Sequence, residues 1–407
     1  MAGDGATCVA CPAEGVDCDE DGSALGGLEV KGDWFRFTAT STVVYACPYP
    51  ANCKGGNATG VGLCAAGAHG PLCSTCEVGY FLDAFAAACV ECDVNAGHLV
   101  GPAAVVAVLV VVALAAYLAR DWLAERTGRM FEHENNQKRV EDALELLTAL
   151  VVTMQILVLL QSNHLQAGGE ELQDPYSEFL DAFSFLALDF VRGVPTSCFV
   201  AVGHFHYVLV WSLLPVVVFG AGCVACREAP PATRTQYLSY FIQGLFLVLP
   251  TMSTTICQTF RCTDYDGGDF SYLAVDHEVD CASAEYDAMV AFALVACLVY
   301  PIGVPLGLYV WLRRYREHLD PLGLFEEDAD RRKEDPVLEH CAVAVFAFRH
   351  KPRYWYFEVY NMLRRLALTS GSLVFGNVNS LLLYILTVAI VTTVIERETQ
   401  AELDPFL

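Results

Sequence analysis

Basic residues are scarce in this 407-residue sequence, where 24 Lys and Arg stand against 48 Asp and Glu and give a formal net charge of −24. Nucleic-acid phosphates are bound by clustered Lys and Arg on an exposed face, so this balance excludes nucleic acid as an expected partner. Charged residues of both signs make up only 18% of the chain, against roughly 25% in soluble domains. This shortage of charge argues against a wholly soluble protein.

Motifs of common active sites are also missing. The sequence contains no nucleophile elbow, no phosphate-binding loop and no HExxH zinc motif, so we expect that the protein is not an enzyme. Residues 1–20 lack the apolar core of a signal peptide. We therefore expect the natural chain to begin upstream of Met1, and we expect further segments beyond Leu407.

Apolar residues, in contrast, make up 55% of the chain and gather into runs of the length that crosses a bilayer. Basic clusters flank these runs, as at Arg313, Arg314 and Arg316, and basic flanks stay in the cytosol. The sequence therefore predicts an α-helical multi-pass membrane bundle over residues 98–407, embedded in a lipid bilayer. We expect about seven spans, near residues 99–119, 146–163, 205–223, 237–256, 288–312, 357–375 and 381–395.

Cysteine is concentrated at the N-terminus, where ten of the 18 cysteines lie within the first 92 residues. An even number of cysteines at short spacing in a Gly-rich stretch is typical of a disulfide framework in an oxidising compartment. We predict a small, disulfide-rich β/loop extracellular domain over residues 1–97, and zinc binding by the pairs Cys73/Cys76 and Cys89/Cys92 is the alternative. The connectivity stays open, but we expect these cysteines to pair among themselves: Cys8, Cys11, Cys18, Cys47, Cys53, Cys64, Cys73, Cys76, Cys89 and Cys92.

The predicted topology follows from these two patterns. The N-terminus lies outside and the C-terminus lies in the cytosol, in the plasma membrane or another membrane of the secretory pathway. The acidic segment 258–286 then faces outward, and we expect a disulfide between its Cys262 and Cys281, with Cys198 as an alternative partner. The triplet beginning at Asn57 is an acceptor for glycosylation on the same side.

One candidate metal site lies in the N-terminal domain. Asp17, Asp19 and Asp21 alternate before Gly22, as carboxylates do at the start of calcium-binding loops. The match is partial, because Leu28 stands where such a loop needs its last glutamate and Cys18 interrupts the run. We expect no cofactor other than this candidate Ca²⁺.

Charge inside the sixth predicted span is the sharpest signal in the membrane half. Glu358, Asn361 and Arg365 share one helical face, and Arg364 lies beside them. An unpaired arginine at the bilayer centre costs at least about 2.5 kcal/mol, so a partner or a water path is implied. We interpret these four residues as candidates for gating or an ion pathway, with snorkelling towards lipid phosphates as the alternative.

Prolines interrupt several of the predicted spans. Pro250, Pro301 and Pro305 each remove a backbone hydrogen bond within an apolar run, which can create a hinge or expose carbonyl groups. Because proline is also frequent in membrane helices without a special role, a purely structural reading of each remains open.

The cysteine spacing from Cys47 to Cys92, with the strings Gly70-Pro71-Leu72-Cys73 and Gly79-Tyr80-Phe81, resembles EGF-like or ephrin-receptor-type repeats. Such repeats precede the membrane region in large multi-pass proteins of single-celled eukaryotes. The string Tyr300-Pro301-Ile302-Gly303-Val304-Pro305 and the run from Tyr354 to Arg365 are similar to the membrane half of those proteins. The architecture as a whole resembles transient-receptor-potential-like channels, which is an analogy of fold.

From this resemblance and the charge pattern we expect a channel-like or sensory membrane protein with an extracellular cysteine-rich head. The alternatives are a seven-span signalling receptor and a cell-surface adhesion or scaffold protein without transport. Besides lipid, the candidate partners are an extracellular ligand, cations attracted by the acidic face, and further copies of the chain in a homo-oligomer.

Overall fold

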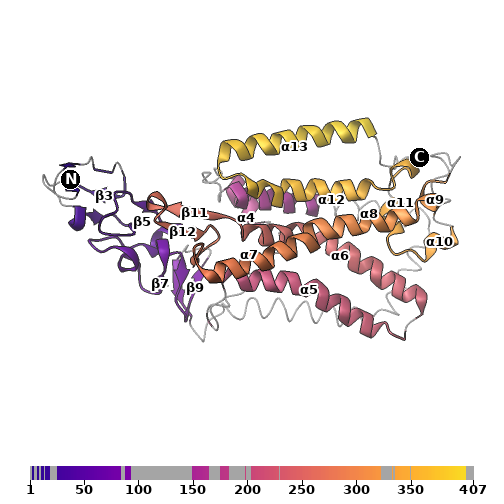
Figure 1. Cartoon of the computed structure of the whole chain (residues 1–407), viewed down its shortest axis with the longest axis horizontal. Helices are drawn as coiled ribbons and strands as arrows, with labels where there is room; N and C mark the ends of the chain where they lie inside the picture. The colour runs from indigo at the N-terminus through magenta and orange to yellow at the C-terminus, as the bar shows by residue number, and fades with distance from the viewer. Residues whose placement is uncertain are drawn as a thin grey trace. The chain divides into compact units, whose positions relative to one another are not determined.

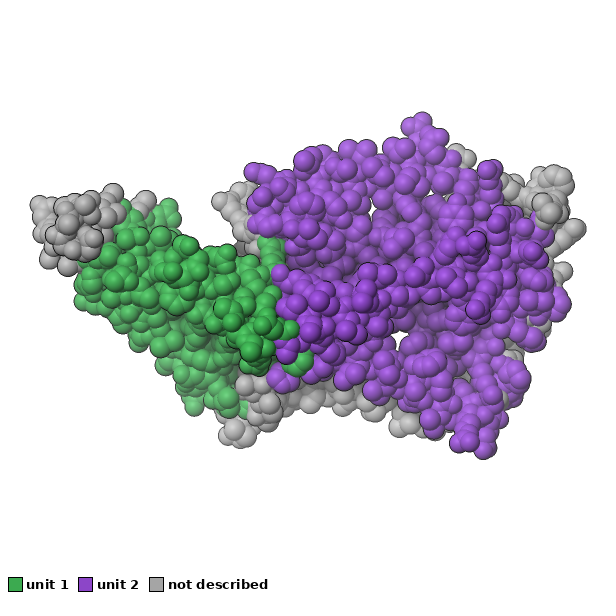
Figure 2. Space-filling model, in the orientation of Figure 1, with its two compact units in different colours: residues 1–149, 190–205, 261–287 green, residues 150–189, 206–260, 288–407 purple. Residues whose placement is uncertain are grey.

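The computed structural model describes most of the chain in two compact units, coloured separately in Figure 2. The first unit draws on residues 1–149, 190–205 and 261–287, and the second on residues 150–189, 206–260 and 288–407. The predicted span at 99–119 lies outside the described residues. The described residues are 2–3, 7–8, 11–12, 14–18, 25–83, 88–92, 149–164, 175–182, 198, 203–228, 230–321, 332, 335–348 and 350–399.

The N-terminal part of the first unit, which we call the head (residues 11–92), is made of short antiparallel strand pairs and 3₁₀ turns (Figure 1). The turns are Leu25–Gly27, Pro50–Asn52, Gly60–Leu63 and Pro71–Cys73. Just before the head, β1 (Ala2–Gly3) pairs with β2 (Thr7–Cys8). The pairs of the head are β3 (Val16–Asp17) with β4 (Glu29–Val30), β5 (Trp34–Phe35) with β6 (Tyr45–Ala46), β7 (Ala68–His69) with β8 (Thr75–Cys76), and β9 (Tyr80–Asp83) with β10 (Ala88–Glu91).

The core of the head is small and rich in sulfur. Strands of two to four residues bury little apolar surface, so cross-links take the place of a large core. Only a few aliphatic and aromatic side chains are fully enclosed, and disulfide sulfurs fill the space between them. The buried core consists of Val30, Phe35, Cys47, Cys53, Leu63, Cys64, Ala68, Leu72 and Cys73.

A three-stranded antiparallel sheet lies between two long helices in the sequence but belongs to the first unit. We call residues 261–287 the hairpin segment. It contains β11 (Cys262–Tyr265), the 3₁₀ turn Asp266–Gly268, β12 (Phe270–Leu273) and β13 (Asp276–Asp280), with β12 in the centre. Gly267 allows the turn between β11 and β12, because its φ of +78° is strained for any residue with a side chain.

Four helices of the described chain are long and apolar enough to cross a membrane. They are α5 (His204–Ala225), α6 (Pro231–Gln258), a continuous helix from Ala284 to Arg314, and α13 (Val378–Thr399). The third consists of α7 (Ala284–Cys297), a π-helical turn (Leu298–Gly303) and α8 (Val304–Arg314). These helices agree with the predicted spans 205–223, 237–256, 288–312 and 381–395, and they indicate a membrane-embedded protein.

The expectation of seven spans is not supported by the described residues. Of the predicted span 146–163, the structure describes the 16-residue apolar helix Ala149–His164, which does not by itself reach the length of a full crossing. The predicted span 357–375 is the helix α12 (Phe357–Leu368) followed by the 3₁₀ turn Ser370–Val374. The backbone leaves the helical range at Thr369, where φ is −92° and ψ is −81°, so α12 ends after 12 residues.

Shorter helices complete the second unit. Within it, α12 packs against α6, α8 and α13 (Figure 1). A buried polar contact joins α6 to the helix Ala149–His164. Gln155 of that helix donates to the Thr251 hydroxyl and to the Leu247 carbonyl of α6, both at 3.0 Å. The remaining helices are α4 (Tyr176–Ala182), α9 (Arg316–Leu319), α10 (Pro336–Glu339), α11 (Ala344–Phe348) and the 3₁₀ turn Pro352–Tyr354.

Candidate functional site

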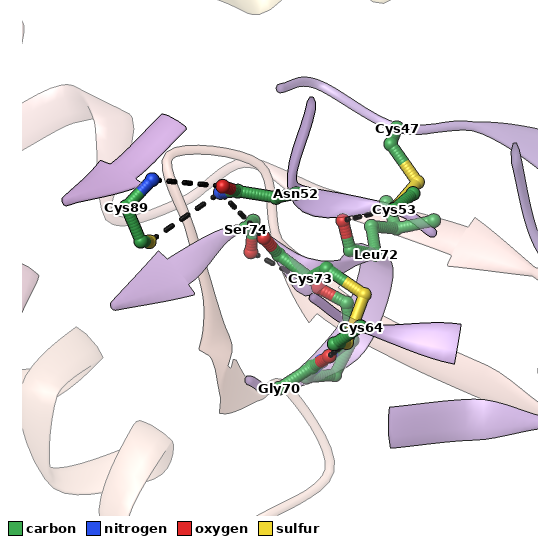
Figure 3. The surroundings of a disulfide bond; sticks show 10 residues. Cys47, Asn52, Cys53, Cys64, Gly70, Leu72, Cys73, Ser74 and Cys89 are labelled. Atoms are coloured by element: carbon green, nitrogen blue, oxygen red, sulfur yellow. Dashed lines mark hydrogen bonds between the residues drawn. A yellow bond between two sulfur atoms is a disulfide. The ribbon is translucent and has the colours of Figure 1, made fainter. Parts of the chain in front are cut away.

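Disulfides hold the head together around one buried asparagine (Figure 3). The amide nitrogen of Asn52 donates to the Cys73 carbonyl at 3.1 Å, and its amide oxygen accepts from the Cys89 backbone N–H at 2.8 Å. Asn52 therefore ties together the disulfides of these two cysteines. The head contains the pairs Cys11–Cys18, Cys47–Cys53, Cys64–Cys73 and Cys76–Cys89.

Cys92 forms its disulfide outside the N-terminal region. It is bonded to Cys198, at a sequence separation of 106 residues, so the expectation that the ten N-terminal cysteines pair only among themselves is wrong for Cys92. Spacing along the chain says nothing about a partner this remote, because only the fold brings Cys198 back to the head. The hairpin segment has its own bond, between Cys262 and Cys281, which is the pair that the sequence favoured.

An aromatic cluster joins the head to the hairpin segment. The ring of Phe37 stacks on Phe270 with centroids 4.8 Å apart, and it lies parallel to Tyr272 at 6.1 Å. Tyr45 of the head meets Tyr265 of β11 edge to face at 5.1 Å. Aromatic pairs of this kind add about 0.5–1.5 kcal/mol each beyond the area that they bury. The hairpin segment is therefore part of the hydrophobic structure of the head.

Polar contacts fix the same arrangement. The Asp266 backbone N–H donates to the Tyr45 hydroxyl at 2.6 Å, and the Asp266 carboxylate accepts a hydrogen bond from the Ser41 hydroxyl. His69 of β7 lies 2.7 Å from the carboxylate of Glu278 on β13. The side chains of His69 and Glu278 are both exposed, and such a pair contributes about 1 kcal/mol at most. The aromatic rings therefore provide most of the stabilisation between the head and the hairpin segment.

A half-buried histidine lies at the edge of the aromatic cluster. The His277 ring nitrogen is 3.1 Å from the Tyr265 hydroxyl. Burial lowers the pKa of His277, and the neighbouring Asp276 carboxylate only partly opposes that effect. Burial, together with Tyr45, raises the pKa of Tyr265 to about 12, so its hydroxyl is protonated at neutral pH and can donate to the neutral imidazole.

The first unit should accordingly lose stability in mild acid. The folded state holds His277 with a pKa below that of the unfolded chain, about 6.5. Its contribution is complete above that value and is lost as the pH falls through the lowered folded pKa. Calorimetry of the detergent-solubilised protein at pH 7.5 and pH 5.0 should show this loss, and His277→Gln, which cannot take up a proton, should reduce it. An equal loss in the variant would contradict the assignment.

The four polar residues predicted in the sixth span lie on α12, where Glu358 forms the centre of a charge network. Its carboxylate is 3.3 Å from the His350 ring, 3.4 Å from the Asn361 amide and 3.9 Å from the Arg365 guanidinium. The His350 and Glu358 side chains are only 3% and 13% exposed. Asn361 and Arg365, which the sequence placed on the same helical face as Glu358, thus both contact its carboxylate. His350, which the sequence did not indicate, contacts it as well.

Arg364 takes a different partner. It forms an ion pair with Glu396 of α13, so neighbouring arginines on α12 are neutralised by separate carboxylates. Glu396 was also missed, although the first acid after the last apolar run was a signal for it. Both arginines therefore have carboxylate partners, and a role of these residues in gating or in an ion pathway stays a prediction.

The predicted hinge prolines lie in different local structures. Pro250 is buried within α6, which continues through it, and Pro305 is buried at the start of α8. Pro301 lies within the π-helical turn, where the ladder is already irregular. Gly303 is the last residue of that turn. A side chain at this position would be too close to the turn, because a Cβ there would lie 2.9 Å from the Leu298 carbonyl oxygen. Of the three, Pro301 is the one associated with a break in helix geometry.

The remaining sequence candidates gain no further support. Asp17 lies on β3, whereas Asp19 and Asp21 fall outside the described residues, and within the described part no cluster of His, Cys, Asp or Glu fits a metal ion. Calcium binding therefore stays a prediction. Asn57 lies exposed in a bend, which a glycosylation acceptor requires. No family model, curated protein or solved structure matches the chain.

Proposed function

We propose that the chain is a channel-like sensory membrane protein, in which the disulfide-bonded first unit faces outside and acts on the helices through the hairpin segment. The observation that carries this proposal is the stacking of the hairpin rings on Phe37 of the head. β11 begins four residues after α6 ends, and β13 ends shortly before α7 begins. A ligand or displacement that moves the head therefore pulls on both helices through the chain itself.

The distribution of disulfides and basic residues supports this orientation. Cys198 precedes α5, and Cys262 and Cys281 lie between α6 and α7, so these helix ends belong on the oxidising side. Arg227 follows α5, Arg234 lies in the first turn of α6, and Arg313 and Arg314 end α8, as expected of cytosolic ends. The three long helices thus alternate consistently between the two sides.

The exposed surface of the long helices supports a lipid environment. Only 17% of the most apolar 18-residue stretch of α5, and 11% of that of α13, is buried within the chain. Large apolar side chains face outward along both, among them Val217, Phe219, Leu383 and Leu386. Such surface is stable in hydrocarbon and not in water. The resemblance to multi-pass proteins with ephrin-receptor-type repeats favours the same proposal.

Cation flux into liposomes that contain the full chain tests the channel-like function. Phe270→Ala, which removes the ring stacked on Phe37, should change the flux at least about threefold, whereas Val61→Ala, an exposed substitution on the head, should leave it unchanged. Wild-type protein that inserts but carries no flux would overturn the channel-like role. G-protein activation, or cell adhesion without flux, would then identify the receptor or the adhesion alternative.

Orientation has its own test. The thiol of Cys223 is free and exposed at the end of α5, on the side that we propose is cytosolic. A membrane-impermeant maleimide should label it only after cells are permeabilised, with Cys223→Ser as the control for specificity. Labelling of Cys223 on intact cells would overturn the proposed orientation.

A further inference from the structure

Two free thiols from different long helices lie in contact in the second unit. The sulfur atoms of Cys257, on α6, and Cys297, on α7, are 3.9 Å apart, although the residues are separated by 40 positions in the sequence. Neither is in a disulfide, and both side chains are half-buried. Cys223, Cys226 and Cys341 are also free, and they lie near the end of α5 or in the segment before α11.

The geometry leaves only a short distance to a bond. A disulfide requires the sulfur atoms to approach to about 2.05 Å, so the two must move together by roughly 2 Å. Both residues lie on regular helix, where a cysteine side chain moves between staggered rotamers. The two sulfur atoms thus start close to van der Waals contact.

A bond between the two cysteines would connect α6 to α7 at a defined place. Cys257 is the last residue but one of α6, and Cys297 is the last of α7, directly before the π-helical turn that contains Pro301. A bond here would fasten the end of α6 to the helix at its least regular point. It would also enclose the hairpin segment, whose Cys262–Cys281 bond lies within the same stretch of chain.

We propose that Cys257 and Cys297 form a redox-sensitive pair that exchanges between two thiols and an interhelical disulfide. The oxidant is a low-molecular-weight disulfide such as oxidised glutathione. One cysteine thiolate attacks a glutathione sulfur, the glutathione S–S bond breaks, and one glutathione leaves as a thiol after taking up a proton. The second cysteine then attacks the mixed disulfide and releases the second glutathione. In total, two cysteine thiols are oxidised and one glutathione disulfide is reduced to two thiols.

This chemistry does not depend on the channel-like function, so the two proposals fail separately. The full-length protein in detergent would be incubated with oxidised glutathione, its remaining thiols blocked with N-ethylmaleimide, and the unreduced digest mapped by mass spectrometry. We expect most molecules to contain a peptide linked through Cys257 and Cys297. Reduced glutathione should reopen this bond while Cys64–Cys73, which is buried in the head, stays closed.

Variants identify the participating residues. Cys257→Ser and Cys297→Ser should each abolish the linked peptide, whereas Cys341→Ser, which removes a buried thiol elsewhere in the unit, should leave its yield unchanged. If either serine variant fails to fold, the peptide map of the wild-type protein still decides. Glutathione adducts without a linked peptide, or a bond that reduced glutathione cannot open, would overturn the proposal.

Discussion

Glu358→Ala should destabilise the second unit by about 3–5 kcal/mol, the cost of removing one partner from a buried charge network. The variant takes away the carboxylate that His350 and Arg365 share. Since both the histidine and the carboxylate are almost fully enclosed, water cannot replace the lost interaction. Glu358→Gln, which keeps an oxygen acceptor for the ring but loses the charge, should cost less.

The neighbouring arginine provides the matched control. Arg364 pairs with Glu396, whose side chain is 41% exposed, and exposed pairs contribute at most about 1 kcal/mol. Glu396→Ala should therefore shift the midpoint of chemical unfolding in detergent far less than Glu358→Ala does. Equal shifts in the two variants would show that α12 does not depend on a buried charge network.

Loss of the Cys64–Cys73 bond should have the second large effect. Replacing both residues with serine should destabilise the head by about 2–5 kcal/mol, as removal of a native disulfide from a small domain does. Both residues are buried, with 5% and 0% exposure, so the variant also places two hydroxyl groups in the sulfur-rich core. Faster cleavage of the head by protease under native conditions would measure this loss.

The Cys11–Cys18 bond allows the two contributions to be separated. Its sequence separation is 7, against 9 for Cys64–Cys73, so the loop-closure terms differ by only about 0.2 kcal/mol. Cys11, however, is exposed. The Cys11→Ser/Cys18→Ser variant should thus be less destabilised, and the difference reports the burial of the core sulfurs. Equal sensitivity to protease would mean that burial contributes nothing.

Much of the membrane half can be predicted from the sequence, because long runs without charge have few other stable structures. The four predicted spans that became long helices each consist of such a run. The predicted span at 357–375 is shorter in the structure, because the backbone leaves the helical range at Thr369 and continues as the 3₁₀ turn Ser370–Val374. An average of hydropathy over the run does not register such a local change of backbone angles.

Contacts between distant segments were the part that the sequence could not provide. Periodicity places Glu358 and Arg365 on one face of a helix, but it does not identify His350 or Glu396, which lie on other elements. Likewise, local spacing suggests Cys262 with Cys281 and has no means of joining Cys92 to Cys198. The stacking of Phe37 on Phe270 belongs to the same class, since more than 200 residues of chain separate the two rings.

The π-helical turn between α7 and α8 holds one residue more than an α-helical turn and so rotates everything after it by about 100°. The buried positions record this change of phase. They recur every three or four residues at Met289, Ala293, Ala296 and Tyr300, then resume one step late at Leu308 and Leu312. A one-residue deletion within the turn would hardly shorten the helix, yet it would turn Tyr309 away from Trp355, on which it now stacks at 5.7 Å. The number of residues in this turn therefore sets which face of α8 points towards α12, and an insertion or deletion there rotates α8 about its own axis.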